Sequence, residues 1–329
     1  MGRQNNFNLI RYCAAVCVVV SHSYGFTGHY EPHPFGPRIS LGGLAVYVFF
    51  AISGYLIYKS FTRNDLGSFA VARFRRIMPG LVVVSLLAAF VVGPLLTALP
   101  LREYFSSPAT WAYVPRTLLL PSETVSLPGL FEGFAAPLTN GTLWTLHYEV
   151  FWYGIVLMFG VFGFRHFPVL LIVFVLSAIA APLSWYIMFG LPFATGMTVA
   201  HYRVPLRWEI AAALTLAGFF NWEALFVALS YSAIWLGTKT TPVLRHFNRA
   251  GDYSYGVYIY GWPVQYALLS LMELTTAQLI AASVFLATVL GALSWHLVEK
   301  PALQAKRTAD ADKPVGGPVL VSAERPVNA

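Results

Sequence analysis

The chain has 329 residues, of which 57% are hydrophobic and only 11% are Asp, Glu, Lys or Arg. Ordinary soluble domains carry roughly a quarter charged residues, so this chain lacks the charge that would cover a soluble globule. The net charge of +7 does not indicate nucleic acid as a partner, because the basic residues lie between apolar runs rather than on one face. The composition argues against a soluble enzyme, a disordered chain and a disulfide-stapled secreted domain, and indicates a protein embedded in membrane lipid.

A helix that crosses the hydrocarbon core of a membrane needs about 20 apolar residues, within a working range of about 17–25. Six stretches satisfy this length: 7–24, 41–61, 80–99, 143–163, 254–272 and 277–297. Two longer apolar blocks are interrupted, the block 168–201 by two prolines and the block 208–238 by a polar step at Asn221. We interpret each block as a hairpin of two short or tilted helices. The sequence therefore predicts an all-α, polytopic integral membrane protein with about ten transmembrane helices.

The distribution of positive charge predicts how these helices are oriented, because Lys and Arg collect on the cytoplasmic side. With ten helices and both termini in the cytoplasm, three of the 21 basic residues lie outside: Arg38, Arg102 and Arg116. The other 18 lie inside or in the inner half of the first span. We expect a membrane-embedded domain over residues 1–301. A disordered cytoplasmic tail is expected over 302–329, because its composition has no periodic pattern.

The segment 100–142 is the largest outer loop of this topology. It is rich in proline and aromatic residues and poor in charge. We expect it to pack on the membrane surface as a cap rather than to extend into solvent.

Ionisable side chains inside a membrane span are costly, so each is a functional candidate. Arg11 and His22 are eleven positions apart, and eleven helical steps of 100° end about 20° past three turns. Both therefore lie on one face of the first span, about 16 Å apart along its axis. The pair could be a snorkelling arginine and a satisfied interfacial histidine. Alternatively, Arg11 grips an anion on the inner side and His22 performs acid–base chemistry on the outer side, for which a histidine is suited.

Glu149 lies about two turns into the fourth of the uninterrupted spans, at a depth that could match His22. A carboxylate that holds an imidazole in one tautomer increases its basicity. We therefore expect Glu149 to pair with His22, although a structural glutamate bonded to a neighbouring helix is the alternative. His147 is two residues away and lies on another side of the helix, so we interpret it as structural.

A cluster of basic residues precedes the third span, over 59–79. The bias of positive charge toward the cytoplasm could explain it alone. Alternatively, Arg73 and Arg76 share a face if this segment is helical, and two guanidinium groups on one face form a phosphate clamp.

His29 and His33 flank an acidic residue, but the adjoining prolines prevent a regular helix, so we predict no metal site.

Several motifs together resemble one family, the integral membrane acyltransferase-3 group of bacterial surface-polysaccharide O-acyltransferases. The matching stretches are Arg11 to His22, Phe49-Phe50-Ala51-Ile52-Ser53-Gly54-Tyr55-Leu56, Arg73 to Pro79, Leu143 to Glu149, and Tyr253 to Tyr258 with Val298-Glu299-Lys300-Pro301. Two positions depart from the family pattern. Trp262 stands where many members have a histidine before a proline, and His147 stands where proline or a small residue is expected.

The resemblance implies transfer of an acyl group, most often acetyl, from cytoplasmic acyl-CoA to a hydroxyl of a surface or lipid-linked glycan. The reaction would take place across the bacterial cytoplasmic (inner) membrane, with acetyl-CoA as donor substrate and no bound cofactor. In this interpretation His22 is a general base or a transient acyl carrier, and Glu149 orients it. Arg11, Arg73 and Arg76 bind acyl-CoA.

A polytopic transporter or flippase of a glycolipid or polysaccharide precursor is the alternative function. Ten spans, broken helices and buried charge would suit it equally. The sequence shows no convincing internal repeat, and the charges cluster in two spans rather than at paired helix breaks. These two features favour the enzyme.

Overall fold

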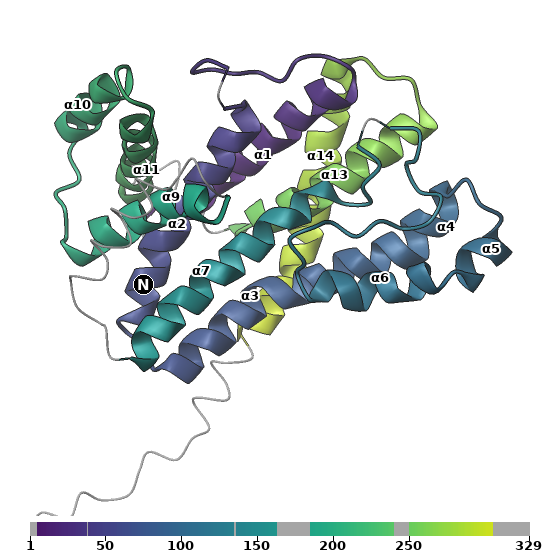
Figure 1. Ribbon diagram of the computed structural model, residues 1–329, viewed down its shortest axis with the longest axis horizontal. Helices are drawn as coiled ribbons and strands as arrows, with labels where there is room; N and C mark the ends of the chain where they lie inside the picture. Colours follow the sequence, from purple (N-terminus) through teal and green to yellow (C-terminus); the bar gives the residue numbers. More distant parts are fainter. Residues whose placement is uncertain (1–4, 38, 135, 163–184, 240–249, 305–329) are drawn as a thin grey trace, which may run out of the picture.

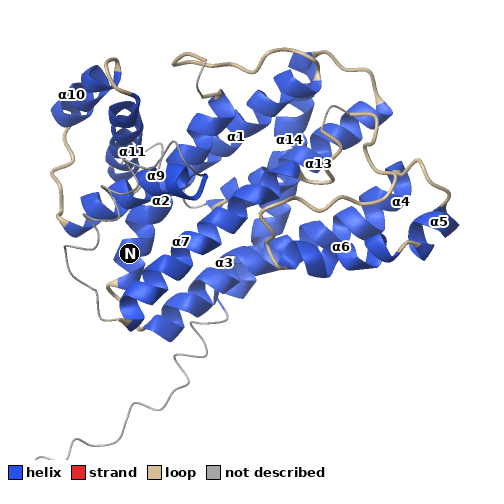
Figure 2. Ribbon diagram, viewed as in Figure 1, coloured by secondary structure: helices blue, strands red, loops and turns tan. Residues whose placement is uncertain are grey.

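The computed structural model describes residues 5–37, 39–134, 136–162, 185–239 and 250–304. Within these ranges every regular element is a helix and no strand is found (Figure 2). The prediction of an all-α protein is therefore confirmed for the described part of the chain.

The helices follow one another along the chain as shown in Figure 1. They are α1 (Phe7–Phe26), α2 (Leu41–Phe61), α3 (Leu66–Leu87), the π-helical turn η1 (Ala88–Val92), α4 (Gly93–Leu96), α5 (Leu101–Ser106), α6 (Pro108–Leu118), the 3₁₀ turn η2 (Gly141–Leu143), α7 (Trp144–Val161), α9 (Trp185–His201), α10 (Trp208–Gly218), α11 (Trp222–Thr238), α13 (Ser254–Leu271), α14 (Thr276–Ser294) and the π-helical turn η4 (Trp295–Glu299).

Within the described residues, four helical stretches are long and apolar enough to cross a membrane: Phe7–Phe26, Leu41–Phe61, Leu66–Leu96 and Thr276–Gln304. Two more predicted spans, over 143–163 and 254–272, are helices of 18 residues each, α7 and α13. The structure thus supports a helical membrane protein.

Side-chain caps explain where several of these helices begin. Ser40 accepts a hydrogen bond from the backbone N–H of Gly43 at 3.2 Å, at the start of α2. Asp65 does the same for Ser68 at 2.8 Å, at the start of α3. Thr275 begins α14 with a capping box. Each cap satisfies backbone donors that the first helical turn leaves without a partner.

Close contacts between backbones fix the positions of two helix pairs. A Cβ atom on Gly54 of α2 would lie 2.0 Å from the carbonyl oxygen of Phe193 in α9. A Cβ atom on Gly256 of α13 would lie 2.5 Å from the Cα atom of Gly291 in α14. Only glycine permits these approaches. The main core lies among α1, α2, α3, α7, α9 and α13.

The helix that contains the predicted third span, 80–99, extends beyond the apolar run. The helix begins at Leu66 and continues without interruption to Leu96. The apolar run marks only its second half, because its first half carries Arg73, Arg75 and Arg76. Arg76 is tolerated in the helix because it binds the carboxylates of Asp252 and Glu299, and Arg73 lies over the rings of Phe69 and Tyr153.

The two interrupted blocks have different outcomes. The block 208–238 forms the helical pair α10 and α11, which turns at Asn221 as predicted. Asn221 caps α11 by accepting a hydrogen bond from Ala224 N–H at 2.9 Å. Of the block 168–201, only α9 is described, so its predicted hairpin lies partly outside the described residues.

In the described part of the segment 100–142, the short helices α5 and α6 pack onto the helix bundle. Its buried residues join side chains of η1 and α13 in a second hydrophobic cluster. We call this cluster the aromatic cap: Ala88, Ala89, Tyr104, Tyr113, Leu127, Leu130, Phe131, Trp262 and Tyr266. The last helix continues to Gln304. The rest of the predicted tail, 305–329, lies outside the described residues.

Candidate active site

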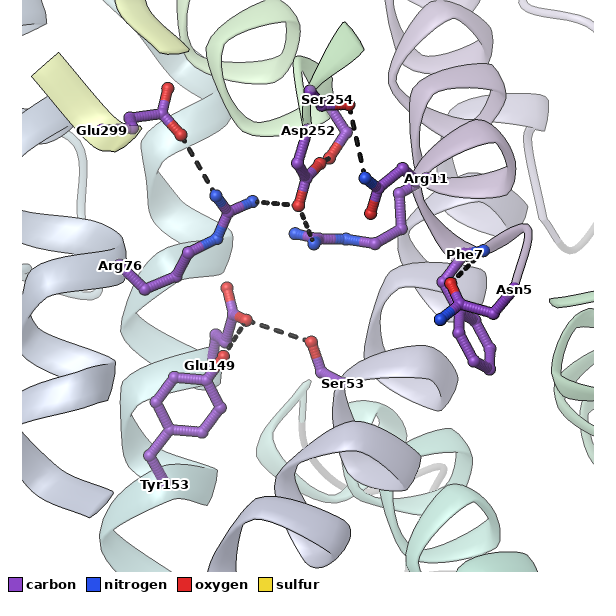
Figure 3. A network of polar contacts seen from close by, with 12 residues as sticks. Asn5, Phe7, Arg11, Ser53, Arg76, Glu149, Tyr153, Asp252, Ser254 and Glu299 are labelled. Carbon is purple, nitrogen blue, oxygen red and sulfur yellow. Dashed lines mark hydrogen bonds and ion pairs between the residues drawn. The ribbon is translucent and has the colours of Figure 1, made fainter. Parts of the chain in front are cut away.

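Four charged side chains from distant parts of the chain form one connected group, which we call the polar network: Arg11, Arg76, Asp252 and Glu299. Arg11 Nη1 and Arg76 Nη2 bind the same oxygen of Asp252, Oδ2, at 2.7 and 2.8 Å. Arg76 Nη1 binds Glu299 Oε2 at 3.1 Å. In Figure 3 both guanidinium groups point to the same oxygen of Asp252, Arg76 from the left of the view and Arg11 from below. The network joins α1, α3, the loop directly before α13 that carries Asp252, and η4.

Local structure holds both carboxylates of the network in place. Ser254, at the start of α13, donates to Asp252 Oδ1 at 2.6 Å. Ser294 donates to Glu299 Oε1 at 3.0 Å, across the five-residue spacing of the π-helical turn η4. π-helical turns are rare, and they often occur at functional sites.

The network balances two positive charges with two negative ones in a largely buried location. The side chains of Arg76 and Glu299 are only 13% and 1% exposed. Burial alone raises the pKa of Asp252, but the guanidinium groups of Arg11 and Arg76 and the bond from Ser254 hold that pKa below its ordinary value. Removing one member of such a group leaves an uncompensated buried charge, which destabilises a protein by about 3–5 kcal/mol.

A cavity of about 40 Å³ lies beside the polar network. Since one water molecule needs about 10–15 Å³, the cavity has room for about three waters or for a small group such as acetyl. One face of α2 contributes four of its residues at helical spacing. The lining residues are Arg11, Val46, Phe49, Phe50, Ser53, Thr145, Leu146, Glu149, Tyr255 and Tyr258.

Glu149 presents its carboxylate to this cavity. Its Oε1 atom accepts a hydrogen bond from Ser53 at 3.1 Å and another from the hydroxyl of Tyr153. In Figure 3 its other oxygen points toward Arg76, whose charge interacts with it. The cavity therefore combines a carboxylate, a serine hydroxyl that it binds, and the guanidinium of Arg11.

His22 lies at the other end of α1, beside the aromatic cap. Its ring meets Trp262 edge-on, with 5.0 Å between ring centroids, and stacks on Phe26 at 5.7 Å. Its Nδ1 atom is buried and has no hydrogen-bond partner among the described residues. The nearby carboxylate whose charge acts on His22 is Glu31, which Ser21 holds at 2.6 Å.

The expected pairing of Glu149 with His22 is therefore wrong. Glu149 binds Ser53 and Tyr153 instead, and His22 is not among the residues that line the cavity. Depth in the membrane was inferred separately for each helix, and it does not reveal which side of a helix faces which neighbour.

His147 binds the carbonyl oxygen of Leu120 through Nδ1 at 2.7 Å. That contact fits a structural role.

Arg73 and Arg76 do not form the expected phosphate clamp, because the guanidinium group of Arg76 is already bound to carboxylates. Both terminal nitrogens of Arg76 bind carboxylates that come from the far end of the chain. Arg73 lies over the rings of Phe69 and Tyr153, at 5.7 and 6.0 Å from their centroids. Its Nε atom is buried without a hydrogen-bond partner among the described residues.

Asp252, Ser53 and Tyr153 are site residues that sequence reasoning missed. Ser53 lies within a recognised motif, and Asp252 lies directly before another. The scarcity of acidic residues, 14 in the chain, could have drawn attention to Asp252. Its partners Arg11 and Arg76 are 241 and 176 positions away, so no local pattern reveals them.

Fold and site together define a class: a helical membrane protein in which buried charges meet at a small internal cavity. Comparison with known proteins makes this class specific. Residues 4–296 match the acyltransferase domain family, and the chain belongs to this family. The recognised resemblance is thereby confirmed, and the protein is an acyltransferase rather than a transporter.

Two relatives match over nearly their whole lengths. The chain is 33% identical over 331 residues to "O-acetyl transferase" of Shigella phage Sf6, an alignment that covers 91% of this chain and 96% of that protein. It is 27% identical over 364 residues to "Nodulation protein 10" of Rhizobium leguminosarum bv. viciae, covering 93% and 95%. No solved structure is a significant match.

Proposed function

We propose that this protein is a membrane O-acyltransferase that moves an acyl group, in the first instance acetyl, from acyl-CoA to a hydroxyl of a surface or lipid-linked glycan. The observation that carries the proposal is the cavity in which Glu149, its bound hydroxyl and Arg11 converge. A carboxylate within hydrogen-bond distance of a reacting hydroxyl is a general base in position. Family membership and the O-acetyl transferase relative support the chemistry.

The proposed topology has ten spans in the bacterial inner membrane, with both termini in the cytoplasm. The distribution of Lys and Arg supports it. In this orientation the polar network and the cavity lie toward the cytoplasm, and His22 and the aromatic cap lie toward the outer face. Donor and acceptor then approach from opposite ends of α1.

The donor is proposed to enter from the cytoplasmic side, where acyl-CoA occurs. Arg73 Nε and Arg75 Nη1 are buried N–H donors without a hydrogen-bond partner among the described residues. Such groups bind phosphate oxygens well. We assign contact with the donor's phosphates to Arg73, assisted by Arg75, and contact with the acyl end to Arg11. Arg76, although it was expected to bind the donor, supports the cavity through Asp252 and Glu299.

The acceptor is proposed to meet His22 on the outer side through one of its hydroxyl groups. An imidazole with one nitrogen unpaired can accept a hydrogen bond from a hydroxyl group. Glu31, rather than Glu149, is the carboxylate that accompanies His22 in this role. Trp262 and Phe26 provide aromatic faces beside it, which suit the apolar face of a sugar ring.

The test uses the purified full-length chain in lipid vesicles, with acetyl-labelled acetyl-CoA and a lipid-linked oligosaccharide. The expected result is label on the saccharide as an ester that mild base removes, with loss of transfer in His22→Ala. The matched control is His147→Ala, which removes a histidine that contacts the backbone outside the cavity. Label that stays on CoA with a range of glycan acceptors would contradict the proposed function.

A further inference from the structure

We propose that Ser53 is a covalent acyl carrier, which takes the acyl group from the thioester donor and holds it as an ester until the acceptor arrives. The inference deepens the proposed function and rests on it. Its basis is the juxtaposition of Ser53, Glu149 and Tyr153 at the wall of a cavity of acyl-group size.

The three side chains have the arrangement of an activated nucleophile. Ser53 Oγ donates to Glu149 Oε1 at 3.1 Å, so the proton that must leave is already directed at the base. Tyr153 donates to the same oxygen and fixes the carboxylate, one helical turn along α7. A nucleophile, a base within hydrogen-bond reach and a third group that orients the base are the general signature of nucleophilic catalysis.

The other hydroxyl groups that line the cavity already have acceptors elsewhere. Tyr255 donates to the carbonyl oxygen of Ile77 at 2.8 Å. Tyr258 donates to the carbonyl oxygen of Thr142 at 3.1 Å and bonds to Thr145 at 2.6 Å. Among the hydroxyls of this cavity in the described part of the chain, Ser53 is the one bound to a carboxylate.

The backbone around Ser53 cannot move away from this position. Its neighbour Gly54 is in direct contact with the backbone of α9, where no Cβ atom would fit. A Cβ atom on Gly196 of α9 would lie 2.2 Å from the carbonyl oxygen of Ala51, one turn earlier in α2. These two approaches fix the rotation of α2 and thereby keep Ser53 directed at the cavity, on the same face as Phe49 and Phe50.

A two-step reaction suits a small cavity of about 40 Å³, because only the acyl group has to be held there between the two steps. An ester on Ser53 lets the thiol leave before the acceptor enters. The donor side and the acceptor side then need not be open at the same time.

Each step balances. Ser53 Oγ attacks the thioester carbonyl carbon, so that a C–O bond forms and the C–S bond breaks; the serine proton passes to Glu149 and from there to the departing thiolate, which leaves as CoA thiol. In the second step the acceptor oxygen attacks the ester carbonyl. The bond to Ser53 breaks, and the proton that the acceptor hydroxyl loses passes to Glu149 and from there to Ser53 Oγ, so that Glu149 ends each step as a carboxylate.

The experiment measures protein-bound acyl groups in the full-length protein in vesicles, with labelled acetyl-CoA and no acceptor. We expect CoA thiol to be released in an amount equal to the enzyme, and the peptide that contains Ser53 to gain the mass of one acetyl group. Ser53→Ala should carry no label and release CoA at least about 100-fold more slowly. Ser53→Cys should carry the label as a thioester, which neutral hydroxylamine cleaves. The matched control is Ser85→Ala, because Ser85 is buried, donates only within α3 to Leu81 at 2.7 Å, and does not line the cavity.

The outcomes separate this inference from the proposed function. Normal acetylation of the glycan by Ser53→Ala, or label mapped to another residue of the wild-type protein, would overturn the role of Ser53 and leave the proposed function standing. A wild-type protein that acetylates no glycan and releases no CoA would overturn both.

Discussion

The two ends of α1 differ in how their polar groups are satisfied. Around Arg11, four charged side chains neutralise one another and two serines complete their hydrogen bonds. Around His22, the neighbours are aromatic rings, and one imidazole nitrogen lacks a hydrogen-bond partner among the described residues. One end is a closed network, and the other presents an unsatisfied group.

This difference indicates two separate tasks. A closed network of buried charges fixes geometry, because moving any member would leave another charge unpaired. An unpaired nitrogen in an aromatic setting remains available to a ligand, since a bond to a hydroxyl would satisfy it. We therefore assign positioning of the donor chemistry to the Arg11 end and contact with the acceptor to the His22 end.

Breaking the polar network at its centre should have the largest effect. Asp252→Ala leaves the guanidinium groups of Arg11 and Arg76 without their shared carboxylate, so we expect a loss of about 3–5 kcal/mol of stability and loss of acyl transfer. Thermal unfolding in detergent, followed by tryptophan fluorescence, measures it. The control is Glu209→Ala, which breaks an exposed ion pair with Arg207 and should change stability by less than about 1 kcal/mol. Equal unfolding temperatures for the two variants would contradict the closed network.

The lowered pKa of Asp252 gives the same prediction a pH dependence. A carboxylate with a lowered pKa stabilises the folded state above the ordinary pKa of aspartate, and this contribution is lost as pH falls through the lowered value. Wild-type stability should therefore decrease on acidification into that range. The decrease should be smaller in Asp252→Asn, which has no carboxylate to protonate. The two curves running parallel would argue against this assignment.

Removing the base at the cavity should affect catalysis more than stability. Glu149→Gln keeps the shape of the side chain but cannot accept a proton, so we expect acyl transfer to fall about 10²–10⁴-fold. Tyr153→Phe leaves the carboxylate in place with one hydrogen bond fewer. Its rate of acyl transfer should therefore fall much less. Initial rates with saturating acetyl-CoA distinguish the two. A Glu149→Gln enzyme with wild-type rates would exclude this carboxylate as the base.

Substitutions of Arg73 and Arg76 should distinguish a residue that binds the donor from a residue that supports the cavity. Hydrogen bonds to charged groups contribute about 1.5–3 kcal/mol, so Arg73→Ala should raise KM for acyl-CoA about 10- to 100-fold with a nearly unchanged unfolding temperature. Arg76→Ala should instead lower the unfolding temperature, because Glu299 and Asp252 lose a partner. Steady-state kinetics and thermal unfolding on both variants provide the comparison. The opposite pattern would reverse the two assignments.

The smallest effect is expected at the His22 end. Trp262→Phe keeps an aromatic edge beside His22 but loses the hydrogen bond from Nε1 to the carbonyl oxygen of Leu138 at 3.0 Å, which contributes about 1 kcal/mol. Trp111→Phe is the matched control. It loses a bond of 2.9 Å to Phe105 at a position that is 58% exposed, so it should cost less. Chemical denaturation of both variants tests this, and a larger loss at Trp111 would speak against a packed cap.

Much of the fold could be predicted from the sequence because apolar length and polar interruptions are local signals. The spans 7–24 and 41–61 and the turn at Asn221 all correspond to helices or helix ends in the structure. The beginning of α3 was missed because hydropathy records only the apolar half of a helix whose other half carries arginines. Arg76 is accommodated by Asp252 and Glu299, which no local window around it contains.

The sequence predicted which residues belong to the candidate site better than it predicted which of them contact one another. Arg11 and Glu149 were identified as costly groups in spans, and both line the cavity. Their partners depend on which helices pack together and with what rotation, as with Asp252 for Arg11 and Ser53 for Glu149. A single sequence does not contain that information in any short window. The pairing of Glu149 with His22 failed for this reason.

The division of labour between the two ends of α1 is tested most directly by separating the two halves of the reaction in His22→Ala. With labelled acetyl-CoA in vesicles, we expect His22→Ala still to release CoA thiol and to retain acetyl on the protein, but to transfer none to the glycan. Glu149→Gln should do neither. A His22→Ala protein that releases no CoA, although it is folded and binds acetyl-CoA, would contradict this division, because His22 would then act in the donor step as well.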